Sequence, residues 1–326
     1  MRSLLNRSLS VLAVASALLA VPALAVDSYP SRAIRIIVPY SPGGQGDITA
    51  RLISEKLATS IGKPVTVENR AGANGIIGID ALAKAEPNGY TIGVVVASHA
   101  LSRAIVPQLP YDPVKDFTPI TTTALTQMAM VISPKLPVST VQEFIDYAKK
   151  HPGELAYKSA GPGSNSHLFG AWFADAAGIE MIHVPYKGSG DSMPDLMSGV
   201  VQMGFDTLPA VRGHVDSKQI KMIAAGGPDR SSQYPNVPTV EEAGLKGFAA
   251  NSWGMVLAPK GTPKAIVDRL NAEIGAILRS DDVKAKFETM GATVVANSPA
   301  EAEAMLEREE ALYTDLVKRL GISITN

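Results

Sequence analysis

Three short segments of the sequence combine glycine with serine or proline, and each stands where a predicted strand passes into a predicted helix. Glycine lets backbone N–H groups approach a ligand, and the positive end of the following helix adds roughly half a charge. The combination suits a small anion such as a phosphate or a carboxylate. The three segments are 38–47, 159–167 and 184–191.

What these segments lack narrows the kind of anion. None of them reads Gly-x-x-x-x-Gly-Lys-Ser/Thr, so no lysine is placed to reach a nucleotide phosphate, and no Gly-x-Gly-x-x-Gly follows the first strand. The first two segments contain neither lysine nor arginine, which indicates neutral hydrogen-bond donors that face a modestly charged group. Each loop alone could be only a tight turn, but three in one chain favour a binding role. At Gly44 we expect a positive φ or a close backbone approach.

The residues needed for catalysis are not arranged for it. The chain has no cysteine, no His-x-x-x-His or His-Glu-x-x-His spacing and no Gly-x-Ser-x-Gly elbow. We therefore predict no enzymatic activity, no catalytic residue, no metal site and no cofactor. The histidines are His99, His151, His167, His183 and His214.

Three polar residues in or beside these loops have two interpretations each. His167 is either a ligand contact or a capping and packing residue of its helix. Asp47 is first a helix N-cap and second a ligand contact. Asp206 ends a predicted strand, where it is either a cleft residue or an ordinary turn residue.

The elements that must position these residues alternate from end to end, which predicts an α/β fold with largely parallel sheets. Apolar spacing predicts amphipathic helices, among them one with the stripe Leu168, Phe169, Trp172 and Phe173. We expect strands over 33–39, 65–68, 90–97, 120–123, 128–133, 155–159, 180–186, 202–205, 221–225 and 253–258. We expect helices over 47–61, 74–86 and 166–177, a helix around 193–197, and a last helix that starts near residue 298 and ends at residue 320.

Three helix starts carry capping signals. Ser139 begins a Ser-x-x-Gln capping box, and Thr262 is expected as an N-cap with Pro263 in the first turn. Ser298 repeats this signal before the last, heavily charged helix.

Composition and the first residues bound the class of protein. The 326 residues are 46% hydrophobic and 19% charged with a formal net charge of −1, a balance that supports a sizeable core and no nucleic-acid partner. Arg2 and Arg7 precede an apolar run over 9–20 and a small-x-small end, which predicts a signal peptide over residues 1–25. The run is shorter than the ~20 residues that span a bilayer. We expect an exported, periplasmic protein, cut between Ala25 and Val26.

At this point the chain resembles the tripartite tricarboxylate transporter (TTT) substrate-binding receptors, the Bug family. Typical stretches are Val-Pro-Tyr-Ser-Pro-Gly-Gly at 38–44, Ser-Asn-Ser-His-Leu at 164–168 and His-Val-Pro-Tyr-Lys-Gly at 183–188. The other matching segments, in order, are 29–32, 67–73, 87–91, 109–117, 238–240, 242–244 and 257–263.

The resemblance implies a type II periplasmic-binding-protein fold, in which two lobes are joined by two crossover strands and a ligand lies in the cleft between them. Lobe 1 would be residues 26–125 plus 254–326, and lobe 2 would be residues 126–253. The crossovers near 127–130 and 251–253 would act as hinges. The implied ligand is a small carboxylate, and the implied partner is a membrane permease of two subunits. We expect the receptor to be monomeric.

The resemblance also assigns the ligand site. The residues that it implies are Tyr40, Ser41, Gly43, Gly44, Gln45, Gly46 and Asp47 from the first loop, Gly163, Ser164, Asn165, Ser166 and His167 from the second, and Ser98, His99 and Asp206 at the far end of the ligand. Val96-Ala97-Ser98-His99 and Phe205-Asp206-Thr207 depart from the common family sequences, so a known ligand cannot be carried over. Two other classes stay open, a sensory partner and an exported α/β enzyme.

Overall fold

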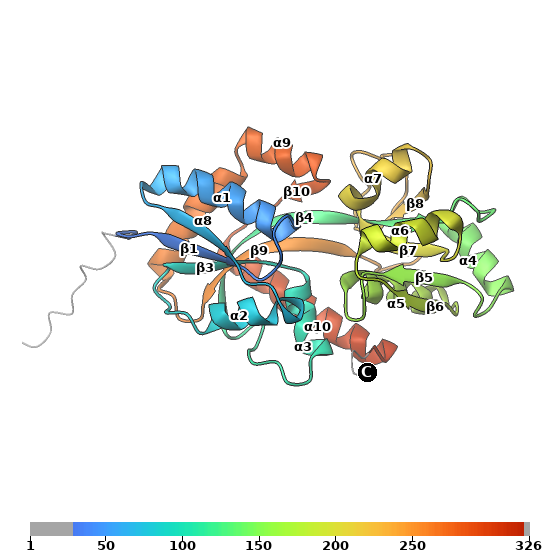
Figure 1. Cartoon of the computed structure of the whole chain (residues 1–326), viewed down its shortest axis with the longest axis horizontal. Helices are drawn as coiled ribbons and strands as arrows, with labels where there is room; N and C mark the ends of the chain where they lie inside the picture. Colours follow the sequence, from blue (N-terminus) through green and yellow to red (C-terminus); the bar gives the residue numbers. More distant parts are fainter. Residues whose placement is uncertain (1–28, 323–326) are drawn as a thin grey trace, which may run out of the picture.

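Two α/β lobes lie side by side and are linked by two long strands in the computed structural model, which describes residues 29–322 (Figure 1). The predicted signal peptide lies outside the described residues. The strands of the first lobe are β1 (Ile34–Val38), β2 (Val65–Asn69), β3 (Thr91–Val96) and β10 (Ala292–Val294), those of the second are β5 (Ala156–Ser159), β6 (Ile182–Pro185), β7 (Met203–Thr207) and β8 (Lys221–Ala225), and the linking strands are β4 (Phe117–Ile132) and β9 (Asn251–Pro259).

The two linking strands run antiparallel to one another, and β4 takes part in both lobes. Its first part pairs with β9 from Phe117 to Gln127, and its last part pairs with β7 and β8. Eight strands follow the order β2-β1-β3-β9-β4-β7-β5-β6, and β8 and β10 each pair with β4 outside this path. The prediction of separate strands over 120–123 and 128–133 is wrong, because residues 124–127 pair with β9 and keep the ladder unbroken.

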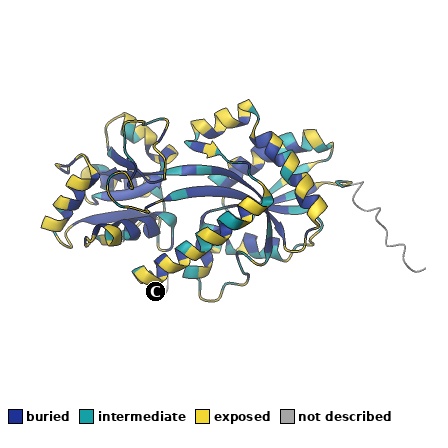
Figure 2. Ribbon diagram, turned by 180° about the vertical axis from the view of Figure 1, so that it is seen from behind, coloured by how far each residue is buried: buried dark blue, intermediate teal, exposed yellow. Residues whose placement is uncertain are grey.

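Helices cover the faces of both sheets, with one side of each helix buried and the other exposed (Figure 2), and the buried residues are mostly hydrophobic. The predicted stripe of Leu168, Phe169, Trp172 and Phe173 is buried, which confirms that Trp172 is a core residue. The helices of the first lobe are α1 (Gln45–Ile61), α2 (Ile76–Ala83), α3 (Ser98–Ile105), α8 (Lys264–Leu278), α9 (Asp281–Thr289) and α10 (Pro299–Leu320), and those of the second are α4 (Val141–Lys150), α5 (Asn165–Ala177), α6 (Ser189–Ser198) and α7 (Leu208–Asp216).

The helix starts agree only in part with the capping signals. Ser298 forms the expected capping box with Glu301. The N-cap of α4 is Thr140 rather than Ser139, because its hydroxyl is the one that accepts the Glu143 N–H. Thr262 is not an N-cap: its hydroxyl donates to the Pro259 carbonyl at 2.8 Å, and α8 begins after Pro263.

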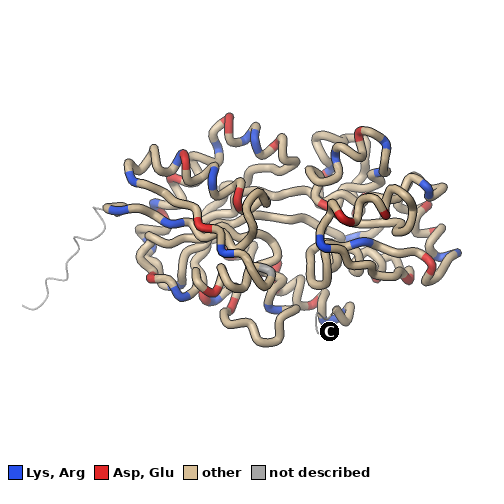
Figure 3. Tube along the Cα trace, viewed as in Figure 1, with Lys and Arg blue, Asp and Glu red and all other residues tan. Residues whose placement is uncertain are grey.

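Charged residues of both signs are interspersed over the two lobes (Figure 3). None of the helices within residues 29–322 is both long and apolar enough to cross a membrane. The last helix, α10, contacts α3 of the first lobe and also α5 of the second, where Arg319 lies 3.4 Å from Asp175. The lobe boundaries at 125/126 and 253/254 stay a prediction.

Candidate functional site

A cavity of about 550 Å³ lies between the lobes and draws its lining from both of them. Tyr40 and Ser98 line it from the first lobe, Ser164 and Asp206 line it from the second, and Ser252 lines it from the linking strand β9. A volume of this size is ordinary for a small-molecule site. The cavity is thus large enough for a small organic molecule held by both lobes.

Helix N-termini surround this cavity. Lining residues include the first residue of each of α2, α3, α5 and α6, and the N-cap Thr207 of α7. The first N–H groups of a helix have no partner inside the helix, and the helix dipole is positive there. No lysine or arginine occurs among the described residues of the lining. The site is therefore built to hold an anion with neutral donors.

The first glycine-rich loop reaches the cavity only through its beginning. Tyr40 and Ser41 line the cavity, whereas Gly43, Gly44, Gln45, Gly46 and Asp47 do not. The left-handed residue of the loop is Gly43, with φ of 86°. The expectation at Gly44 is wrong, because Gly44 is extended at φ −79° and an added Cβ would meet nothing closer than 3.8 Å.

Asp47 holds this loop in shape. The N-cap of α1 is Gly44, so Asp47 is not the N-cap that its sequence position indicated. Its carboxylate accepts the Gly43 N–H at 2.9 Å, the Arg51 guanidinium at 3.0 Å and the Asn69 amide at 2.9 Å. These bonds, with that from Arg51 the strongest, lower the pKa of Asp47 to about 2. The carboxylate is therefore charged at neutral pH and fixes the conformation of the loop through its bond to the Gly43 N–H.

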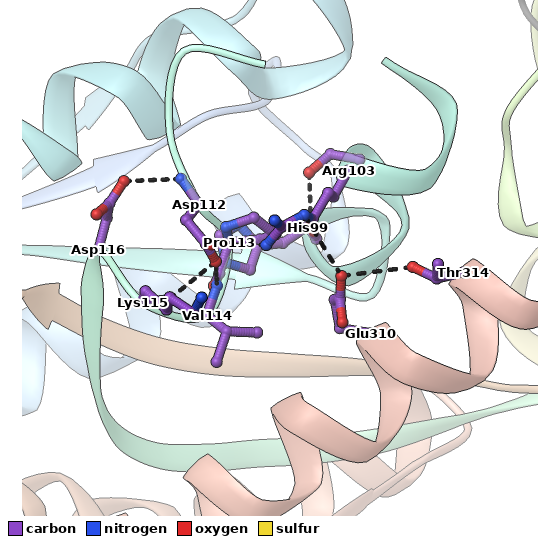
Figure 4. A network of polar contacts seen from close by, with 10 residues as sticks. His99, Arg103, Asp112, Pro113, Val114, Lys115, Asp116, Glu310 and Thr314 are labelled. Atoms are coloured by element: carbon purple, nitrogen blue, oxygen red, sulfur yellow. Dashed lines mark hydrogen bonds and ion pairs between the residues drawn. The ribbon is translucent and has the colours of Figure 1, made fainter. Parts of the chain in front are cut away.

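The Ser98-His99 pair at the start of α3 divides between cavity and core. Ser98 lines the cavity and its hydroxyl lies 3.1 Å from the hydroxyl of Tyr40. His99 is completely buried and donates from Nε2 to the Pro113 carbonyl at 2.8 Å (Figure 4). Burial lowers the pKa of His99 to about 4. His99 therefore packs behind the cavity wall rather than lining it.

The second glycine-rich loop lies along the cavity. Gly163, Ser164, Asn165 and Ser166 all line it, and Ser164 caps α5 by accepting the His167 N–H at 3.3 Å. Each of these positions is one that the sequence singled out. Their binding role stays a prediction.

His167 supports this loop from behind. Its Nδ1 accepts the Gly163 N–H at 3.2 Å, and its ring stacks on His183 with centroids 3.8 Å apart. Burial, and secondarily the nearby His183, lowers the pKa of His167 to about 4. The ring packs behind the loop and does not line the cavity, and a ligand contact of His167 stays a prediction.

Asp206 brings a partner that the sequence did not indicate. It lines the cavity at the end of β7, and one of its oxygens forms an ion pair with the buried Lys158 of β5. The other oxygen accepts the hydroxyl of Ser189. Ser189 belongs to the third glycine-rich segment, which thus reaches the cavity. The Lys158 pairing depends on strand neighbours that are 48 residues apart.

Comparison with known proteins agrees with this architecture. Residues 49–322 match the family described as "Tripartite tricarboxylate transporter family receptor". The chain belongs to this family. Protein BugT of Bordetella pertussis is 36% identical over 324 residues, which cover 98% of this chain and 99% of BugT. The TTT receptor of the Bug family that the sequence motifs predicted is confirmed.

Solved structures of similar proteins extend the likeness to three dimensions. The R. palustris protein Rpa4515, solved with adipate, is 34% identical with a TM-score of 0.79, over 91% of this chain and all of that one. MatC from Rhodopseudomonas palustris, with bound malate, is 30% identical with a TM-score of 0.75, over 89% of this chain and all of that one. The two-lobe periplasmic-binding fold is confirmed.

Proposed function

We propose that this TTT receptor is a periplasmic protein that captures a small organic carboxylate between its lobes and delivers it to a two-subunit membrane permease. The observation that carries the proposal is the cavity lined by helix N-termini and hydroxyl groups, with no cationic side chain among the lining residues that the structure describes. Adipate and malate in two similar receptors support a carboxylate as the ligand. Capture and release need no chemistry, so we propose that the ligand leaves unaltered.

The test is a thermal-shift screen of the protein against a panel of mono-, di- and tricarboxylates, followed by calorimetry. A ligand that binds only the native state stabilises by about 2.7 kcal/mol at 100 times its Kd, which shifts the melting temperature measurably. Recovery of the bound carboxylate intact after long incubation is expected. If the recovered carboxylate is chemically altered, the protein is an enzyme rather than a receptor. If only phosphates stabilise the protein, its ligand is not a carboxylate.

We further propose that the lobes close on the ligand by rotation at residues 127–130 and 251–253. Ser41 on one side and Ser164–Ser166 on the other each supply part of the donor set, so a ligand that bridges them favours the closed form. Small-angle scattering should show a smaller radius of gyration with saturating carboxylate. An unchanged radius with binding confirmed by calorimetry would count against closure.

A matched pair of glycine variants tests whether the shape of the first loop matters. Gly43→Val places a branched side chain at φ 86°, which costs about 1–2 kcal/mol, whereas Gly44→Val meets extended backbone and open space. We expect carboxylate binding to weaken about tenfold in Gly43→Val and to change little in Gly44→Val. If both variants fold and bind the carboxylate with equal affinity, the first loop does not contribute to the binding site.

A sensory role is the second candidate, in which the loaded receptor engages a signalling protein instead of a permease. Both roles use the same cavity. Cross-linking of the carboxylate-loaded protein to membranes of its native cells distinguishes the two roles by the membrane protein that is captured. We expect a monomer that binds no nucleic acid, which sedimentation would check.

A further inference from the structure

Of the two partners in the Lys158–Asp206 ion pair, only the negative one lines the cavity. Asp206 is the one charged side chain among the described residues of the lining, and its side chain is 9% exposed. Its partner Lys158 is only 2% exposed and does not line the cavity. The Lys158 stem crosses Gly204, where an added Cβ would come within 2.6 Å of its Cγ. The negative partner of the ion pair therefore faces the cavity, and the positive partner lies behind it.

The Asp206 carboxylate lies beside the start of α6. It accepts the hydroxyl of Ser189, the first residue of α6, and Asp206 itself directly precedes Thr207, the N-cap of α7. A carboxylate at this place is favourable for the positive end of α6. The starts of α2, α3 and α5 keep no such counter-charge among the lining residues. A ligand carboxylate thus finds its favourable place away from Asp206.

The hydrogen-bonding capacity at Asp206 is not exhausted. An ionised carboxylate has about four acceptor positions, and the protein uses one on each oxygen, through Lys158 and Ser189. The proton of Ser189 is committed to Asp206. The group that faces the ligand at this place is consequently an acceptor.

We propose that the Asp206 end of the cavity selects a hydrogen-bond donor, so that the ligand is a carboxylate with a hydroxyl or amino group at its other end. This inference rests on the proposed function and narrows its ligand class. A second carboxylate at that end would face like charge, and an apolar end would leave the Asp206 acceptor without a partner. Linear dicarboxylates of the same length are therefore the poorer ligands.

The test compares molecules that differ only at one end, by calorimetry at neutral pH. For each chain length from four to six carbons, the series contains the ω-hydroxy acid, the ω-amino acid, the dicarboxylate and the unsubstituted acid. At the length that fits, we expect the hydroxy or amino acid to bind at least about tenfold tighter than the dicarboxylate and than the unsubstituted acid. A dicarboxylate that binds as tightly would overturn this inference and leave the carboxylate receptor intact. If no carboxylate of any kind binds, the proposed function itself fails.

Variants connect the preference to the ion pair. Asp206→Asn removes the negative charge but leaves Lys158 buried alone, so the double variant Lys158→Met/Asp206→Asn is made as well, and circular dichroism checks the fold of both. The tenfold preference over the dicarboxylate, which depends on the negative charge, should fall to within about twofold in the double variant. The control is Asp191→Asn, an exposed acid in the first turn of the same α6 that does not line the cavity. A preference that survives in the folded double variant would overturn the assignment to Asp206.

Discussion

Each wall of the cleft carries the dipeptide Ser-His at the start of a helix, Ser98-His99 on α3 and Ser166-His167 on α5. Both serines line the cavity, and both histidines lie behind it. The bonds of the two histidines differ, however. His99 donates to the Pro113 carbonyl, which lies in a loop away from the cavity, whereas His167 accepts the N–H of Gly163, which itself lines the cavity.

The difference teaches that a shared motif can serve stability on one wall and loop geometry on the other. His99 lies among Tyr111 and Phe117, and within the described residues its Nδ1 has no hydrogen-bond partner. His167 is part of a polar group in which His183 lies 2.7 Å from the hydroxyl of Ser159. We expect changes at His99 to affect unfolding and changes at His167 to affect binding.

Acid should produce the largest effect, through two buried histidines. The pKa of His99 and that of His167 each fall from 6.5 to about 4 on folding, so the unfolded state binds more protons between these values and stability decreases as the pH drops from 6.5 toward 4. For the fully buried His99 alone, urea unfolding should show a loss of about 2 kcal/mol from pH 7.5 to pH 5. Asp47, with its pKa of about 2, stays charged throughout this range. His99→Met should make the dependence less steep by that amount, and an equally steep curve would contradict the assignment.

His167→Phe should have the next largest effect. The ring can still stack on His183, but the Gly163 N–H loses its acceptor, which costs about 1 kcal/mol and weakens carboxylate binding about fivefold. Calorimetry of the variant measures this loss. His99→Met should bind the carboxylate as the unchanged protein does. Weaker binding in that variant would mean that His99, like His167, affects the ligand site.

The smallest effects are expected at the serines. Ser166 accepts the Ala160 N–H at 2.9 Å, whereas within residues 29–322 the hydroxyl of Ser98 forms a hydrogen bond with the hydroxyl of Tyr40 alone, at 3.1 Å. Ser166→Ala should therefore cost about 1 kcal/mol of stability, and Ser98→Ala less than about 0.5 kcal/mol. Thermal unfolding of the two single variants ranks them. The reverse order would mean that the first wall depends on its hydroxyl more than its contacts indicate.

The sequence predicted what depends on local pattern. The alternation of strands and helices, the buried stripe of α5 and the Ser298 capping box all follow from neighbours within a few positions. The glycine-rich segments were recognisable for the same reason, because each joins a strand to a helix.

What the sequence could not supply depends on the register of distant strands. Lys158 and Asp206 meet only because β5 and β7 are neighbours in the sheet. The direction of the His99 and His167 rings follows from tertiary packing, which local sequence pattern does not predict, so the two interpretations of His167 could not be separated from the sequence. The continuity of β4 depends on its pairing with β9, more than 120 positions away in sequence.

The lining of helix ends and hydroxyls has a consequence for the medium in which the protein acts. Attraction between full charges on a surface weakens as salt rises, over a Debye length of about 8 Å at physiological ionic strength. Helix ends act within about one turn, and charges that are partly buried in a cleft are screened by salt much less than charges on a surface. Affinity should therefore vary little with ionic strength, and association gains little from long-range steering. Such a cavity tolerates fluctuating salinity, a property that a ring of lysines would forfeit.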